Sequence, residues 1–309
     1  MRRASIRRLA VLGALGLLVP LAAACEPLTN APPGGGEVVN GTYRVGPFNL
    51  APAGQPGDES NSSGTNLPRP AGAFGLKTMD FDLVDANGNS LPHSAAHLHH
   101  VVMTNPARQS QFCSNWPERF AGSGSERTPI RMPDPYAYMV GANDQWNAIW
   151  HVMNESTTPQ QVYIQYKVGY QPGATAQNTR AVTPFFLDVT GCGNSTYDVP
   201  GNGGPDSVHT NTRTWTAPWT GIAVGMGGHL HGGGIDITLR NNSNGTECRM
   251  VAHYEHSHPG ASPGSIDRCI AHNLVTQGNT FSVTSRYDNS QPYEDVMGIV
   301  MAYAWRGTQ

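Results

Sequence analysis

The sequence predicts an all-β protein with two β-sandwich domains in series, jelly-roll-like in form, behind an export signal. Three observations support this: only 13% of the residues are charged, 36 glycines and 24 prolines occur among 309 residues, and apolar and polar residues alternate with period two. Coiled coils, helical bundles and charged disordered chains need more charge or more helix formers, so these classes are excluded. A net charge of −3, with no Lys or Arg cluster beyond residue 8, argues against a nucleic-acid partner.

Residues 1–24 are expected to be a lipoprotein signal peptide. Arginines occupy four of the first eight positions, an apolar run covers residues 9–24, and small residues stand directly before Cys25. The run is shorter than the roughly 20 apolar residues that span a membrane. The pattern resembles a bacterial lipobox, in which Cys25 carries a lipid after cleavage, and an ordinary secretory signal is the alternative. It predicts a protein anchored to the membrane of the bacterial cell envelope through Cys25 and facing the extracytoplasmic side.

The rest of the chain is long enough for two domains. Residues 25–37 are rich in proline and glycine and are interpreted as a tether. Because a typical domain has about 100–200 residues, we expect a first sandwich at 38–190 and a second at 191–309. The boundary is placed in the irregular stretch 191–205.

Four segments have the residue pattern of strands. Residues 162–168, 235–240 and 281–287 alternate apolar and polar side chains, with Asp236 on the face opposite Ile235 and Ile237. Residues 296–305 are apolar on both faces, which is typical of a strand at the centre of a packed sandwich. Turn pairs such as Asn244-Gly245 separate these segments.

Four cysteines follow Cys25 and are expected to be oxidised outside the cytoplasm. Of the three possible pairings, closeness in the chain favours Cys113 with Cys192 and Cys248 with Cys269. Free or metal-binding thiols are the alternative, which the absence of any Cys-x-x-Cys pair disfavours.

The twelve histidines are grouped, and the groups indicate metal binding. His229 and His231 are two positions apart, so both imidazoles project from one face of a strand and can reach one ion. His97 and His99 form a similar pair, whereas the adjacent His99 and His100 reach one ion only across a bulge or at a strand end. The spacing leaves both of these pairs open. The alternative is that these histidines are surface or buried structural residues.

The order of three motifs resembles a known family. His99-His100 precedes the apolar residues 101–103, His229-Leu230-His231 follows, and Met297 lies in the apolar segment 294–301. This set resembles the copper type II, ascorbate-dependent monooxygenases, such as peptidylglycine α-hydroxylating monooxygenase and dopamine β-monooxygenase, over most of the chain after residue 24. The resemblance implies two β-sandwich domains across a cleft, each with a copper site. Residues 227–305 are also similar to plant stress-up-regulated, nodulin-like proteins.

The resemblance implies a role for each motif. His229, His231 and Met297 would form the catalytic copper site where O₂ is reduced, and two imidazoles with a thioether suit copper that cycles between two oxidation states. His99 and His100 would hold the copper that supplies the second electron. The family's third histidine at that site corresponds to Gln165, so either His97 or His151 completes the site, or the first copper is weakly bound or absent.

The expected function is that of an envelope-anchored, copper-dependent monooxygenase that hydroxylates an unidentified small substrate with O₂. It would use one or two copper ions and ascorbate or another small reductant. In the peptidylglycine enzymes an arginine and a tyrosine bind the carboxylate of the substrate. The corresponding positions in this sequence are Gly227 and Met301, which cannot bind a carboxylate in that way. Peptide amidation is therefore not expected. Two alternatives remain: a non-catalytic lipoprotein of the same fold that stores or delivers copper, and a metal-free interaction module.

Overall fold

Strands form all the regular secondary structure of the computed structural model, which describes residues 36–255, 261–270 and 273–307. The all-β prediction is confirmed. These residues contain no helix that is long and apolar enough to cross a membrane. The predicted signal peptide, Cys25 and all but the end of the predicted tether lie outside the described residues.

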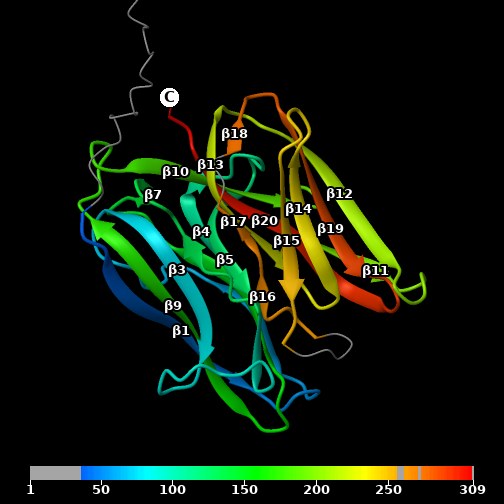
Figure 1. Ribbon diagram of the computed structural model, residues 1–309. Helices are drawn as coiled ribbons and strands as arrows, with labels where there is room; N and C mark the ends of the chain where they lie inside the picture. The colour runs from blue at the N-terminus through cyan, green and yellow to red at the C-terminus, as the bar shows by residue number, and fades with distance from the viewer. Residues whose placement is uncertain (1–35, 256–260, 271–272, 308–309) are drawn as a thin grey trace, which may run out of the picture. The chain divides into compact units, whose positions relative to one another are not determined.

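The largest sheet has eleven strands (Figure 1). Its main path runs β1-β9-β3-β7-β10-β20-β13-β17, while β6 pairs with β3, β11 with β20 and β18 with β13. The strands are β1 (Val39–Leu50), β3 (Phe74–Val84), β6 (Ile130–Arg131), β7 (Tyr136–Val140), β9 (Gln160–Pro172), β10 (Arg180–Asp188), β11 (Thr196–Pro200), β13 (Gly221–Leu230), β17 (Arg268–Cys269), β18 (Asn273–Val275) and β20 (Pro292–Trp305).

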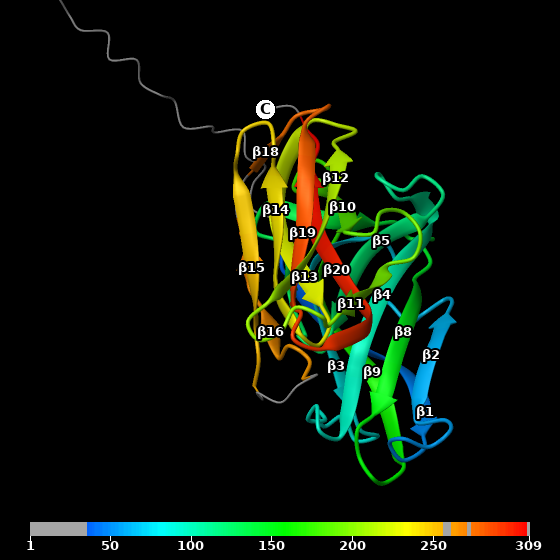
Figure 2. The same ribbon diagram turned by 90° about the vertical axis from the view of Figure 1, so that its right-hand side faces the viewer.

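Two smaller sheets pack against this one. The four-stranded sheet has the order β2-β8-β4-β5 and the five-stranded sheet the order β12-β19-β14-β15-β16. Figure 2 shows them on either side of β13 and β20. Their strands are β2 (Glu59–Gly64), β4 (Ala96–Gln109), β5 (Pro117–Gly124), β8 (Asn147–Asn154), β12 (Val208–Thr216), β14 (Gly234–Asn241), β15 (Glu247–His253), β16 (Ser265–Ile266) and β19 (Thr280–Asp288).

The four predicted strand segments lie in β9, β14, β19 and β20, and β20 is central, between β10 and β13. The alternation fails at Asp236, which is buried like the adjacent Ile237, with only 1% of its surface exposed. The pairing of β14 with β19 shifts between Gly234 and Asp236. This bulge breaks the period-two alternation, and Arg249 and Arg286 bind the buried carboxylate.

Two large apolar cores lie in the unit Pro32–Gln309. The first contains residues of β1, β3, β7 and β9 and one face of the four-stranded sheet, and the second lies between the five-stranded sheet and β10, β13 and β20. Strand β10 precedes the predicted domain boundary but pairs with β20, which follows it. One sheet therefore crosses the boundary, and the division into two domains stays a prediction.

Both favoured disulfide pairings are present. Cys113 bonds Cys192, which ties the segment after β4 to the turn after β10. Cys248 bonds Cys269 and ties β15 to β17.

Candidate metal centre

A β-bulge in β4 brings His99 and His100 together. In the pairing of β4 with β8, Leu98 lies opposite Val152 and His100 lies opposite His151, so His99 has no partner residue. Such an extra residue re-aims the side chains of a strand. The Nδ1 atoms of His99 and His100 are 3.3 Å apart. From the sequence, two adjacent histidines were expected to share an ion only across a bulge or at a strand end, and a bulge is present here.

His151 lies beside this pair. His99, His100 and His151 each offer a ring nitrogen, and these atoms lie within 4.8 Å of one another. Two nitrogens bound to one ion in tetrahedral geometry, each about 2.0–2.1 Å from it, stand about 3.3 Å apart. The separation of the His99 and His100 nitrogens matches this spacing, and the triad as a whole could hold a metal ion. Gln165 lies on β9, where its Oε1 accepts a hydrogen bond of 3.0 Å from Arg44.

The second predicted pair lies at the end of β13. His229 is in the strand, His231 follows its last residue, and the two ring centroids are 5.1 Å apart. The ring of His231 also contacts that of His99, at 4.0 Å between centroids. The two ligand sets that the sequence assigned to separate ions therefore meet. We call the combined group the histidine cluster; its members are His97, His99, His100, His151, His229 and His231.

Glutamates hold three of these rings. His151 Nε2 donates to Glu59 over 2.9 Å, and His229 Nδ1 donates to Glu126 over 3.1 Å. Similarly, His97 Nδ1 lies 3.4 Å from Glu155. A carboxylate on one ring nitrogen fixes the tautomer and leaves the other nitrogen free for a metal. Glu59 and Glu126 could not be identified from the sequence, because they lie 92 and 103 residues from their histidines.

The buried nitrogens of the cluster are free to bind. Nε2 of His229 and Nε2 of His231 have no hydrogen-bond partner among the described residues. Burial, reinforced by neighbouring histidines, lowers the pKa of His99 to about 2 and that of His100 to about 3. The same causes hold the pKa of His231 well below its ordinary value. These rings are therefore neutral near pH 7 and carry the lone pairs that a metal needs.

Gly124 allows the close packing of this site. A Cβ atom at this position would stand 2.5 Å from Cε1 of His229, 2.7 Å from the His99 carbonyl oxygen and 2.8 Å from Oε2 of Glu126. Its backbone N–H donates to Glu126 over 2.9 Å. Only glycine fits between these groups. No local sequence pattern revealed that position 124 requires glycine.

Met297 shares a face of the sheet with His229. His229 lies opposite Ile299 in the pairing of β13 with β20, and Met297 is two residues from Ile299. The Tyr287 hydroxyl accepts a hydrogen bond from the His231 N–H (2.8 Å) and donates one to the Met297 carbonyl oxygen (2.5 Å). One buried hydroxyl thus ties the segments of two predicted ligands together. The ligand role of Met297 stays a prediction.

Comparison with known proteins points to the same chemistry. No protein-family model matches the chain. The chain is 27% identical over 232 residues to "Probable copper-dependent oxygenase clz3" of Cochliobolus lunatus, covering 68% of this chain and 72% of that protein. It is 25% identical over 255 residues to "Probable copper-dependent oxygenase M1" of a Phoma species, covering 75% of this chain and 64% of that protein. These relatives support a copper-dependent, oxygenase-like function.

Similarity to solved structures is distant. PNGF-II matches with a TM-score of 0.42 and 9% identity, over 87% of this chain and 66% of that one. The major capsid protein P2 of bacteriophage PM2 matches with a TM-score of 0.35 and 9% identity, over 88% and 99%. No functional argument follows from similarity at this level.

Proposed function

We propose that the protein is a copper-dependent monooxygenase that hydroxylates a C–H bond of a small molecule with O₂. The observation that carries the proposal is the histidine cluster, in which six imidazoles converge, those of His229 and His231 being buried, and glutamates hold three of the rings. Imidazole binds both copper oxidation states, and a thioether favours the reduced one. The two copper-dependent relatives support the same reaction class.

Some residues of the site would bind copper, and others orient the residues that bind it. His99, His100 and His151 would hold one copper, and His229 and His231 with Met297 would hold the other. Copper, when bound, supplies the one-electron chemistry that the reduction of O₂ requires. Glu59 and Glu126 keep the rings of His151 and His229 oriented.

The reaction needs an external electron donor. One oxygen atom enters the C–H bond, and the other leaves as water with two electrons and two protons. A small reductant such as ascorbate would supply the electrons. The proposed partners are therefore the substrate, O₂ and this reductant.

Copper reconstitution combined with oxygen uptake tests the proposal. We expect two copper ions per chain and ascorbate-supported O₂ consumption, both reduced in His229→Ala. The matched control is His253→Ala, because His253 is exposed and its Nε2 pairs with Asp267 at 2.8 Å, outside the histidine cluster. One copper ion without oxygen uptake would support the storage or delivery alternative, and no bound copper would refute both.

A further inference from the structure

An apolar cavity of about 470 Å³ opens onto the histidine cluster. One wall comes from the four-stranded sheet and the other from β10, β13 and β20. The side chains that matter most are His100, Val102, Ile149, His229, Met297 and Met301. His100 and His229 thus connect the cavity directly to the proposed copper ligands.

The cavity lies where two sheet faces approach each other. Val102 lies opposite Ile149 on one side and opposite Gly122 on the other, so these three positions share a face. A Cβ atom on Gly122 would stand 3.2 Å from Met301 Sδ and 3.5 Å from Cε1 of Phe186. The absence of a side chain at Gly122 therefore leaves room between the sheets.

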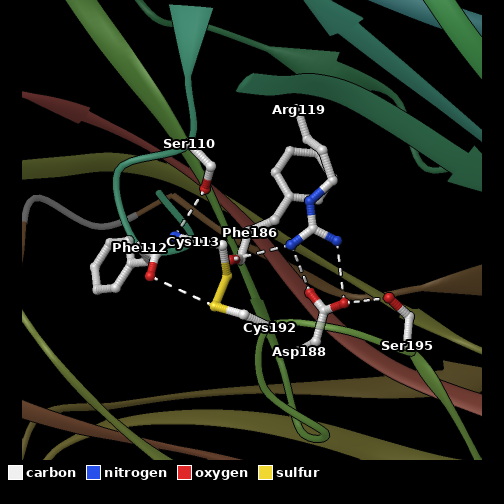
Figure 3. The surroundings of a disulfide bond; sticks show 8 residues. All are labelled: Ser110, Phe112, Cys113, Arg119, Phe186, Asp188, Cys192 and Ser195. Carbon is white, nitrogen blue, oxygen red and sulfur yellow. Dashed lines mark hydrogen bonds and ion pairs between the residues drawn. A yellow bond between two sulfur atoms is a disulfide. The ribbon is translucent and has the colours of Figure 1, made fainter. Parts of the chain in front are cut away.

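The charge in the cavity wall is already neutralised. Apart from the histidines, Arg119 is the only ionisable residue among those lining the cavity in the described structure. Its guanidinium donates to both carboxylate oxygens of the buried Asp188, over 3.0 and 2.8 Å, and lies 4.9 Å from the centroid of the Phe186 ring (Figure 3). Ser195 donates to the same carboxylate. No unpaired charge remains to bind an ionic substrate group.

A separate cavity of about 500 Å³ contacts other members of the histidine cluster and has a different character. Its ionisable lining residues are His93, His97, His99, His231, Glu155, Glu255, Tyr293 and Glu294. A hydrophilic reductant or metal ion would find polar partners there. The apolar cavity is thus distinguished by its lining, not by its size.

We infer that the substrate is a neutral, predominantly hydrocarbon small molecule that binds in the apolar cavity beside His100 and His229. The reaction at that position rests on the proposed function, whereas binding itself does not require copper. Burial of apolar surface drives such binding, and cavities of this volume hold drug-sized ligands. Trp116 and Ile149 also line the cavity and are exposed, so the entrance is apolar as well.

A neutral fluorescent probe, N-phenyl-1-naphthylamine, tests this inference with metal-free and copper-loaded protein at pH 8. We expect one binding site in both forms. Ile149→Glu should weaken binding at least tenfold, because it places a charge at the entrance. Val208→Glu is the matched control, since Val208 is 43% exposed, against 45% for Ile149, and lies on β12 away from the cavity. 1-Decanol should displace the probe at concentrations at least tenfold lower than decanoate or decylammonium.

Two results would overturn the inference: equal displacement by decanol and its charged analogues, or equal effects of the two glutamate variants. Oxygen uptake by the copper-loaded protein separates this failure from failure of the proposed function. If uptake persists while decanol fails to compete, the substrate class is wrong and the oxygenase proposal stands. If the probe and decanol bind as expected but copper does not, the cavity assignment stands and the oxygenase proposal falls.

Discussion

His151 and Gln165 occupy contrasting surroundings, and this contrast predicts which of them serves a metal. His151 lies beside His99 and His100 in the four-stranded sheet, whereas Gln165 lies in the eleven-stranded sheet and accepts a hydrogen bond from Arg44 on the neighbouring strand β1. His151→Ala should therefore reduce the copper content of the reconstituted protein from two ions to one. Gln165→Ala should leave it unchanged, because the Gln165 amide bonds Arg44 and belongs to a different sheet. Metal analysis of the two variants measures the difference.

The unfolding free energy of Gln165→Ala provides a control for the two variants. Loss of the bond between Gln165 and Arg44 should cost about 1 kcal/mol of unfolding free energy without affecting copper. If Gln165→Ala lost copper while His151→Ala kept it, the first site would be wrongly placed.

At His99 the sequence left two ligand pairs open, and which pair binds a metal stays a prediction. Residues 97, 99 and 100 offered two possible ligand pairs, and the bulge opposite β8 brings His99 and His100 together. A bulge depends on how two strands pair, and β8 lies about 50 residues further along the chain. The glutamates that hold the rings were unpredictable for the same reason. The histidines themselves were predictable, because their residue type and spacing are local.

Asp236 predicts a pH-dependent contribution to stability. Burial alone would raise its pKa, but hydrogen bonds and charges from Arg286 and Arg249 outweigh burial and hold the pKa below its ordinary value. Its ion pairs therefore stabilise the fold above about pH 4 and lose their effect as pH falls through the folded-state pKa. Asp236→Asn should lower the unfolding free energy by about 1–3 kcal/mol at pH 7.

Urea unfolding of wild type and Asp236→Asn at pH 7 and pH 3 measures this effect. The difference between the two proteins should shrink at the lower pH. An equal difference at both values would show that Asp236 contributes by packing alone.

The sequence predicted where several strands lie in the chain, but not which strands pair with one another. Alternating residues identified β9 and β19, and residues apolar on both faces identified β20 as a central strand. The position of β10 between β7 and β20 joins residues far apart in the chain, which periodicity does not encode. This pairing also brings Phe186 to the apolar cavity.

Tyr287 connects three strands and predicts a coupling between them and the metal site. It lies on β19, and its hydroxyl bonds the backbone of His231 after β13 and that of Met297 on β20. Tyr287→Phe leaves both backbone groups without this partner and should cost about 1–3 kcal/mol of unfolding free energy. It should also weaken copper binding at the second site, which competition with a Cu(I) chelator measures.

Tyr197→Phe is the matched control for this prediction. Its hydroxyl bonds Ser285 at 2.7 Å, and its ring lies 6.0 Å from that of Tyr287, but it does not bond the His231 or Met297 backbone. Equal Cu(I) affinities in the two variants would contradict a positioning role for Tyr287.

For the molecule as a whole, we propose that a lipid on Cys25 anchors the protein to the cell envelope. Growth with labelled palmitate should tag the wild-type protein. Cys25→Ala should abolish the tag and either release the protein or leave it unprocessed, because the alanine cannot carry the lipid. Membrane retention of Cys25→Ala with normal processing would refute the lipobox interpretation.

The position of the histidine cluster predicts that copper stabilises both cores together. The cluster joins residues of β4 and β8, in the four-stranded sheet, to residues at the end of β13, which belongs to the second core. A ligand that binds only the folded state stabilises it by about 2.7 kcal/mol at 100 times its dissociation constant. Because β10 and β20 also join the two halves, thermal unfolding should occur in one transition, at a higher temperature with copper than without.

Calorimetry of the metal-free and copper-loaded protein measures this effect, with His229→Ala and His253→Ala as the test and control variants. The shift should be smaller in His229→Ala, which removes a predicted ligand, and unchanged in His253→Ala. Two separate transitions, with copper raising only one of them, would show that the halves unfold independently despite the shared sheet. That result would favour the two-domain division and would place the bound copper within a single domain.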